Sequence, residues 1–315
     1  MGLSSLVTWR ILNEEQLDSI LNNKSILIRG SHSDDRDEFI QKKMSSSQDV
    51  IVLSYDTENV KVVISFSQFL TGMNLPGIED PVLMCDRVSE IIQSLSCVVI
   101  LDITSLASEL VFMLLKSFKE CSVENVYAVY VQPLEYIVER DAVLIPNYVL
   151  SDARSSISSI PGFLVLPNDL QSLLIVFLGF EGGRFHELRE HIQTDGNTEI
   201  RPILPLPSYS AGWHMRTLYS NLSTLKESEV IREIKRVTSW DPFLAFNMLE
   251  QIYNEFSESY QINVAPLGTK PHTLATALFA IKHDDVRVMY DHPKVSVHRS
   301  IGVGPVRGYN LKGLI

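Results

Sequence analysis

Two segments of this 315-residue chain show the same order of features, and this recurrence constrains the fold more than any other part of the sequence. Residues 97–133 and 260–293 each contain an apolar strand, a turn with a threonine, a helix and a second apolar strand that ends in Tyr-x-x-Pro. The strands lack polar alternation, which is typical of parallel strands covered by helices on both faces. Each segment therefore predicts a βαβ unit with a right-handed crossover.

A shorter strand–turn–helix pattern precedes each βαβ unit. The first begins with an apolar strand at 25–29 and the second with one at 173–179, and a polar turn leads from each strand into a helix. Together these segments predict an α/β protein with two Rossmann-like, doubly wound halves, mostly parallel sheets and an internal duplication. The alternative is a chance recurrence of apolar runs.

The boundary between the halves is predicted from turn-forming residues. Proline, serine and glycine residues mark 146–165 as a linker, so the halves are expected at 1–145 and 166–315. In the second half, 201–257 reads as a helical insertion that opens with three prolines in six residues, and the chain ends in a basic, glycine-containing tail. Within the insertion, Asp241 is the expected N-cap of a helix that begins at Pro242.

Composition excludes several classes of protein. A formal net charge of −11 argues against a chain with an extended nucleic-acid surface. The apolar runs are too short to cross a bilayer, and the N-terminal residues lack the pattern of a signal peptide. Three cysteines without CxxC spacing favour a reduced compartment and no zinc ribbon. We therefore expect a cytoplasmic protein that contacts no membrane.

The turn best suited to an anion is Gly268-Thr269-Lys270, which follows an apolar strand and opens a helix at Pro271. Free backbone N–H groups, the helix dipole, the threonine hydroxyl and the lysine ammonium all favour a bound anion, and His272 lies in the same helical turn. Gly268 would let a ligand approach the backbone closely. The alternative is an ordinary capped turn between a strand and a helix.

This strand, Gly-Thr-Lys turn and Ala/Leu-rich helix resembles the signature of the CARF-type Rossmann domains. Those domains bind cyclic oligonucleotide messengers, usually across a dimer, in CRISPR-linked and related antiviral systems. The resemblance implies a nucleotide-sensing role. The chain departs from the family pattern in placing Pro266-Leu267 before a single Gly268, where the family usually has two glycines.

Further turns are expected at the same sheet edge, because the carboxyl ends of parallel strands meet there. Thr104 and Ser105 follow the strand of the first βαβ unit, and two arginines lie in the first turns of the opening helices. The complete predicted ligand-binding set is Gly268, Thr269, Lys270, His272, Thr104, Ser105, Arg184, Arg36 and Arg299. The basic tail that carries Arg299 is either a solvated tail or a segment that closes over the site.

The sequence matches no catalytic template. His186 and His191 are five residues apart, which separates them on a helix, and no metal site is predicted. Asp102, Glu181 and His292 are the candidate acid–base groups. Asp102 would contact a ribose hydroxyl or a metal-bound water, or would instead cap the helix that follows it.

These observations favour a ligand-sensing or nucleotide-binding module that recognises a small phosphorylated ligand, including an oligonucleotide, and signals to a protein partner or homodimer in antiviral defence. An enzyme acting on a nucleotide or other phosphorylated small molecule is the second hypothesis. An interaction subunit of a larger defence assembly is the third. The sequence identifies no cofactor.

Overall fold

The chain is an α/β protein with two sheets, and its contacts divide it into two compact units. The computed structural model describes residues 10–31, 34–36, 39–44, 49–66, 79–137, 150–153, 156–193, 198–295 and 300–315. Unit 1 comprises Met1–Tyr136 with Val297–Ile315, and unit 2 comprises Ile137–Ser296. Unit 2 is therefore inserted into the chain of unit 1.

Unit 1 contains a mixed seven-stranded sheet in the order β1-β14-β6-β5-β2-β3-β4. Its strands are β1 (Ile11–Leu12), β2 (Ser25–Gly30), β3 (Asp49–Asp56), β4 (Lys61–Phe66), β5 (Val98–Asp102), β6 (Val126–Tyr136) and β14 (Ser300–Asn310). The four central strands β3, β2, β5 and β6 are parallel. Antiparallel strands complete both edges, because β4 pairs with β3, β14 pairs with β6, and β1 pairs with β14.

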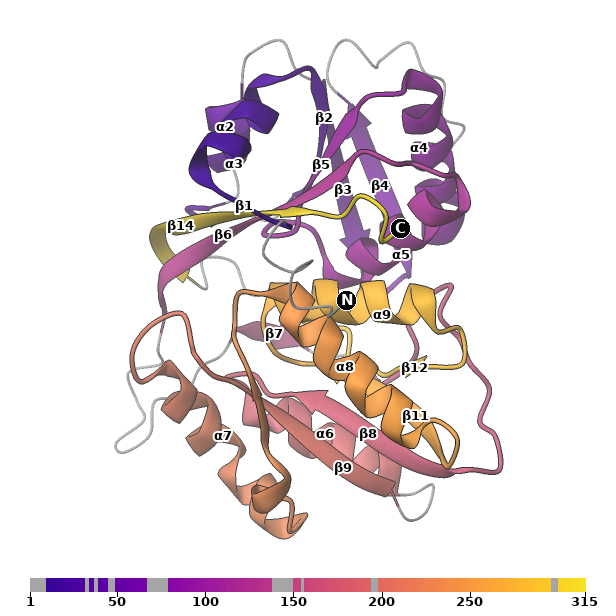
Figure 1. Ribbon diagram of the computed structural model, residues 1–315, viewed down its shortest axis with the longest axis vertical. Coiled ribbons are helices and arrows are strands. Elements are labelled where there is room, and N and C mark those ends of the chain that lie inside the picture. The colour runs from indigo at the N-terminus through magenta and orange to yellow at the C-terminus, as the bar shows by residue number, and fades with distance from the viewer. Residues whose placement is uncertain are drawn as a thin grey trace, which may run out of the picture. The chain divides into compact units, whose positions relative to one another are not determined.

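Helices cover the sheet of unit 1 on opposite sides (Figure 1). They are α2 (Glu14–Asn22), α3 (Phe39–Lys43), α4 (Pro81–Leu95) and α5 (Ser108–Glu120). Helix α2 begins with a capping box between Asn13 and Gln16, and α4 begins after the N-cap Asp80. Leu17 of α2 and Ile40 of α3 belong to a buried cluster with residues of β2, β5 and β6.

Unit 2 contains an all-parallel five-stranded sheet in the order β10-β9-β8-β11-β12. Its strands are β8 (Gln171–Phe177), β9 (Thr198–Pro205), β10 (Lys235–Val237), β11 (Tyr260–Pro266) and β12 (Arg287–Val288). Counted from β8, this order is 3-2-1-4-5, which is the order of Rossmann-type folds. A separate antiparallel pair joins β7 (Ser151–Ala153) to β13 (Lys294–Val295).

The residues of β8 alternate between the two faces of this sheet. Leu173 and Ile175 belong to a cluster with α8 and α9, and Leu174 and Val176 belong to a cluster with α6 and α7. The helices are α6 (Gly182–Gln193), α7 (Trp213–Glu227), α8 (Pro242–Phe256) and α9 (Lys270–Lys282), with a 3-10 helix at Ile231–Glu233. Figure 1 shows α8 and α9 together over one face of the sheet. The central strands are thus buried on both faces, as parallel strands require.

The two predicted βαβ units are confirmed as β5-α5-β6 and β11-α9-β12. The prediction of mostly parallel sheets is confirmed for unit 2, whereas the sheet of unit 1 is mixed. The N-cap Asp241 and the helix that begins at Pro242 also occur as predicted.

The predicted insertion at 201–257 is wrong, because this segment supplies β9 and β10 of the sheet as well as α7 and α8. The prolines that indicated irregular chain are compatible with a strand. Pro202 pairs with Val176 of β8, and β10 begins its pairing only at Ile203. Pro202 therefore lies on a locally open edge, where a missing N–H group is tolerated.

The C-terminal tail was expected in the second half, but it forms β14 in the sheet of unit 1. Its register runs from Ser300 opposite Tyr136 to Asn310 opposite Tyr127. The division between the units falls at Tyr136, and the described residues of the expected linker belong to unit 2.

Two substitutions on β14 test whether this strand stabilises unit 1. Tyr309 is fully buried, whereas Ile301 on the same strand is 55% exposed. Tyr309→Ala should destabilise unit 1 by about 3–5 kcal/mol, because it leaves a cavity in the core. Ile301→Ala should change stability by only about 0.5 kcal/mol. Hydrogen exchange at the amides of β6 measures both effects, and equal effects of the two substitutions would contradict this placement of β14.

Candidate functional site

The switch point of unit 2 lies between β8 and β11, which are central neighbours in the sheet. The chain runs from β8 to β9 on one side of this pair and from β11 to β12 on the other side. The connections therefore leave in opposite directions, and the turns after β8 and β11 lie side by side at the carboxyl edge. They are in close contact, because a Cβ atom added to Gly179 would lie 2.2 Å from the backbone oxygen of Leu267. In open parallel sheets, ligands are generally bound outside the carboxyl ends of the strands at such a switch point.

The turn after β11 is capped, as the alternative interpretation of this turn expected. Thr269 is the N-cap of α9, and its hydroxyl oxygen accepts a hydrogen bond from the N–H of His272 at 3.4 Å. The same hydroxyl donates to the carbonyl of Ser239 at 2.7 Å. Because Pro271 has no N–H and His272 uses its own, the helix start offers fewer free donors than the sequence suggested. Lys270, the first residue of α9, is half-buried.

His272 is completely buried beneath this turn. Its ring stacks on Phe177 with centroids 4.7 Å apart, and its Nε2 lies 3.0 Å from the carbonyl oxygen of Thr238. Nδ1 has no hydrogen-bond partner among the described residues. A Cβ atom added to Gly268 would lie 2.8 Å from Nδ1, so this nitrogen faces the glycine of the turn. Burial lowers the pKa of His272 to about 4, and the imidazole is therefore neutral at physiological pH.

Arg184, which the sequence suggested as a phosphate-binding residue, makes an ion pair within unit 2. Its guanidinium is buried and donates to both carboxylate oxygens of Asp291, at 2.7 and 2.6 Å. Burial lowers the pKa of Arg184, but the carboxylate of Asp291 more than offsets this and holds the pKa above its ordinary value. This bidentate pair joins the start of α6 to the segment after β12.

Glu181 and His292, two of the candidate acid–base groups, also make contacts within unit 2. The carboxylate of Glu181 accepts hydrogen bonds from the N–H groups of Leu150 and Ser151 and from the hydroxyl of Ser151, at 3.0–3.1 Å. His292 has a positive φ of 43°, and its Nε2 lies 2.9 Å from the hydroxyl of Ser158. Both side chains therefore hold the segment before β8 against the core.

The glycines of the turn after β8 allow helix α7 to approach. A Cβ atom added to Gly182 would lie 1.8 Å from the backbone oxygen of Ser220. The side-chain amide of Asn221 donates to the carbonyl of Gly179 at 2.8 Å. Helix α7 thus packs directly on this turn, which leaves these glycines with a packing role rather than that of a phosphate-binding loop.

Sequence reasoning missed an aromatic cluster at the same edge. Trp213 packs edge to face against Phe180 at 5.6 Å and against Tyr209 at 6.4 Å, measured between ring centroids. These residues follow β8 and β9 or begin α7. Their spacing in the sequence gives no signal, because the strand order that brings them together was not predicted.

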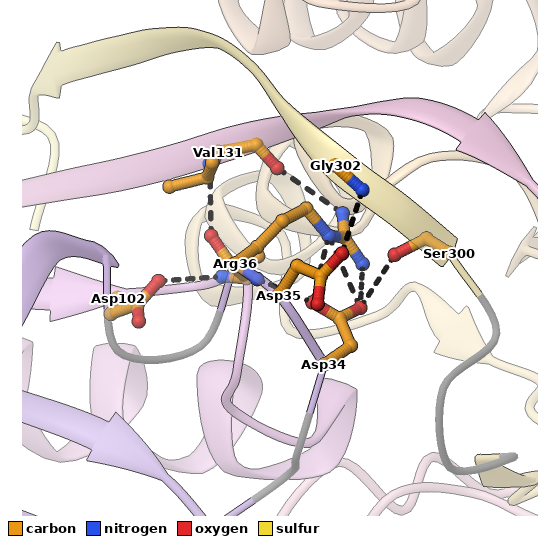
Figure 2. A network of polar contacts seen from close by, with 8 residues as sticks. Asp34, Asp35, Arg36, Asp102, Val131, Ser300 and Gly302 are labelled. Carbon is orange, nitrogen blue, oxygen red and sulfur yellow. Dashed lines mark hydrogen bonds and ion pairs between the residues drawn. The ribbon is translucent and has the colours of Figure 1, made fainter.

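In unit 1, the predicted residues after β5 form an internal network, and Figure 2 shows Asp102 as part of it. The buried carboxylate of Asp102 accepts hydrogen bonds from the N–H of Thr104 at 3.0 Å and from the hydroxyl of Ser105 at 2.9 Å. Ser105 accepts from the N–H of Gly30, and Thr104 accepts from the N–H of Val131. Burial raises the pKa of Asp102. Asp102 does not cap the helix that follows it, because α5 begins at Ser108 after the N-cap Ala107 and has no side-chain cap. Asp102 instead holds the turn between β5 and α5, and the network joins β2, β5 and β6 at their carboxyl ends.

Arg36 is also buried and engaged within unit 1, so it does not present its charge as the sequence predicted. Its Nη2 lies 2.6 Å from the carboxylate of Asp34, and its Nη1 donates to the carbonyl of Val131 at 3.2 Å. Burial raises the pKa of Asp34, but the hydrogen bonds and charge of Arg36 lower it below its ordinary value overall. Figure 2 shows this pair between the turn after β2 and strand β6.

The same turn also holds β14. The hydroxyl of Ser300 donates to Asp34 at 2.7 Å, and the N–H of Gly302 donates to Asp35 at 2.9 Å (Figure 2). Side chains after β2 therefore fix the first residues of a strand from the far end of the sequence.

The predicted site residues thus separate into two groups. Gly268, Thr269, Lys270 and His272 lie together in unit 2, which also contains Arg184, Glu181 and His292. Asp102, Thr104, Ser105 and Arg36 belong to unit 1. The expectation that all the turns share one sheet edge is wrong, because they belong to two sheets. Arg299 lies outside the described residues.

The chain matches no protein-family model, and no curated protein matches it significantly. Within the described part of the chain, no group of three or more His, Cys, Asp or Glu side chains is arranged to hold a metal ion. None of the helices described is long and apolar enough to cross a membrane.

The buried histidine predicts a pH dependence of stability. His272 is neutral in the folded chain down to about pH 4, whereas in the unfolded chain it is protonated below about pH 6.5. Between these values the unfolded state binds more protons, so the free energy of unfolding decreases as the pH decreases. The contribution of His272 should fall by about 2–3 kcal/mol between pH 7 and pH 4.5.

His272→Gln removes this titration and keeps a donor for the carbonyl of Thr238. The variant should therefore show a weaker pH dependence than the wild-type chain, measured as hydrogen-exchange protection of α9 at the two pH values. An unchanged dependence in the variant would exclude His272 as its source.

Proposed function

We propose that unit 2 binds a small phosphorylated, nucleotide-like ligand at the Gly268-Thr269-Lys270 turn and that the chain acts as a ligand-sensing module. One observation carries the proposal: the strand order of unit 2 puts this turn beside β8 at the switch point of a Rossmann-type sheet. Rossmann-type folds bind nucleotides at that position.

The local chemistry of the turn supports an anionic ligand. Helix α9 is 13 residues long, and the positive end of its dipole lies at Lys270. The ammonium of Lys270 adds a positive charge at the same place. At the start of α6, the carboxylate of Asp291 already occupies the guanidinium of Arg184 in a buried ion pair. We therefore assign the anion to the α9 turn rather than to the α6 turn.

Sensing is better supported than catalysis because the candidate acid–base groups are engaged within their own units. Asp102 accepts from Thr104 and Ser105, Glu181 accepts from the backbone before β8, and His292 contacts Ser158. From the CARF resemblance, the proposal takes signalling to a protein partner or homodimer in antiviral defence.

The proposal includes an internal duplication. The parallel strands follow the order β3-β2-β5-β6 in unit 1 and β9-β8-β11-β12 in unit 2, so each unit places its opening strand between the same two neighbours. A glycine near the end of each opening strand also packs against a backbone oxygen of the turn after the next central strand. Gly30 lies against Ser105, and Gly179 lies against Leu267.

Lys270→Ala tests the proposed site against a matched control on the same helix. Lys282, at the opposite end of α9, is 52% exposed at its side chain and pairs with Glu250. Losing the charged contact at Lys270 should weaken binding by about 1.5–3 kcal/mol, whereas Lys282→Ala should leave affinity unchanged. Isothermal titration with AMP, NAD⁺ and a cyclic tetra-adenylate measures the effect.

Mass spectrometry of small molecules released from the purified chain would identify a ligand retained from the cell. The proposal is contradicted if Lys270→Ala binds as tightly as the wild-type chain. A lower melting temperature with unchanged affinity would assign Lys270 a structural role instead.

A further inference from the structure

We propose that Nδ1 of His272 accepts a hydrogen bond from the ligand, so that the site selects a phosphorylated molecule with a hydroxyl or N–H donor beside its phosphate, as in a ribose phosphate. This inference rests on the proposed function, because it concerns the same turn of unit 2. It extends the proposed function by specifying which class of phosphorylated ligand the turn selects.

The hydrogen bond at the other ring nitrogen fixes the tautomer of His272. Nε2 lies 3.0 Å from the carbonyl oxygen of Thr238, and a carbonyl oxygen can only accept. Nε2 therefore carries the proton, and a neutral imidazole protonated at Nε2 has a lone pair at Nδ1. The nitrogen that faces the turn is thus an acceptor.

This acceptor is unsatisfied in the structure. The side chain is fully buried, and Nδ1 has no partner among the described residues. A buried acceptor without a partner costs about 1–3 kcal/mol. A ligand that donates to Nδ1 removes this cost, so a donor at this position contributes more to binding than one that merely replaces a water contact.

The position of Nδ1 couples the donor to the anion site. A Cβ atom added to Gly268 would lie 2.8 Å from Nδ1, and Gly268 immediately precedes the N-cap of α9. The backbone oxygen of Leu178 and the Cβ atom of Phe177 lie within 3.3 Å of the same position. The proposal therefore requires the turn at 267–269 to move aside when a donor binds at Nδ1.

A deprotonated phosphate oxygen is a poor partner for Nδ1, because two acceptors would face each other. The phosphate belongs at Lys270 and the helix start, and the neighbouring donor belongs at His272. A ligand with both groups satisfies both positions, whereas sulfate, an anion with no proton to donate at neutral pH, satisfies only one.

Two substitutions separate the roles of the ring nitrogens. In His272→Gln, the amide nitrogen takes the place of Nε2 and keeps a donor for Thr238, but no acceptor stands at Nδ1. In His272→Asn, the amide oxygen takes the place of Nδ1, but the contact with Thr238 is lost. The probes are ribose 5-phosphate, which carries hydroxyl donors, and sulfate, which carries none at neutral pH.

The wild-type chain should bind ribose 5-phosphate more tightly than sulfate. His272→Gln should lose about tenfold in affinity for ribose 5-phosphate and bind sulfate unchanged. His272→Asn should keep the preference for ribose 5-phosphate. Nitrogen NMR of the wild-type chain supplies a measurement that needs no variant: the Nδ1 resonance should shift upfield with ribose 5-phosphate and stay in place with sulfate.

The inference is overturned if His272→Gln keeps full affinity for ribose 5-phosphate, or if the wild-type chain shows no preference and no shift at Nδ1. Sulfate binding that still depends on Lys270 would then leave the proposed function standing. Failure of the wild-type chain to bind either probe overturns the inference, and the nucleotide titrations with Lys270→Ala decide the proposed function separately.

Discussion

The pairing of β14 with β6 joins the two parts of the sequence that form unit 1, which are separated in the chain by all of unit 2. Strand β6 pairs with β5 only over Val126–Val129, whereas its pairing with β14 extends to Tyr136. β14 in turn pairs with β1, so the sheet edge depends on it. Asp34 and Asp35 after β2 bind the first residues of β14, which joins the centre of the sheet to this edge.

Two buried arginines show how the carboxyl edges of both sheets are closed. Arg36 pairs with Asp34, and Arg184 pairs with Asp291. A guanidinium inside a protein requires a carboxylate and satisfied hydrogen bonds, because desolvation of an isolated charge costs several kcal/mol. Each arginine therefore fixes the conformation of a turn, and its guanidinium pairs with a carboxylate of the same unit. The α9 turn is different, since its buried histidine keeps an acceptor without a partner.

The sequence predicts the local elements well, because their signals are local. Apolar strands, the N-cap Asp241 and the βαβ units all depend on residues near one another in the chain. The partner of Arg184 is 107 residues away, and no spacing rule identifies it. The turn at Gly268 was predicted from its own residues, whereas the aromatic cluster around Trp213 depends on the order of the strands. The C-terminal tail was assigned to the wrong half for the same reason, because the sequence of a strand does not determine which strand it pairs with.

The insertion of unit 2 has a consequence during synthesis on the ribosome. All of Ile137–Ser296 is translated between β6 and β14, which takes roughly 10–30 seconds at about 5–20 residues per second. The sheet of unit 2 uses only residues from within this stretch and can close as soon as it emerges. β6 meanwhile has an unpaired edge, the kind of edge that attracts other strands. The unit that is synthesised first is therefore completed last, and a nascent chain stalled inside unit 2 exposes that edge to chaperones and to other nascent chains.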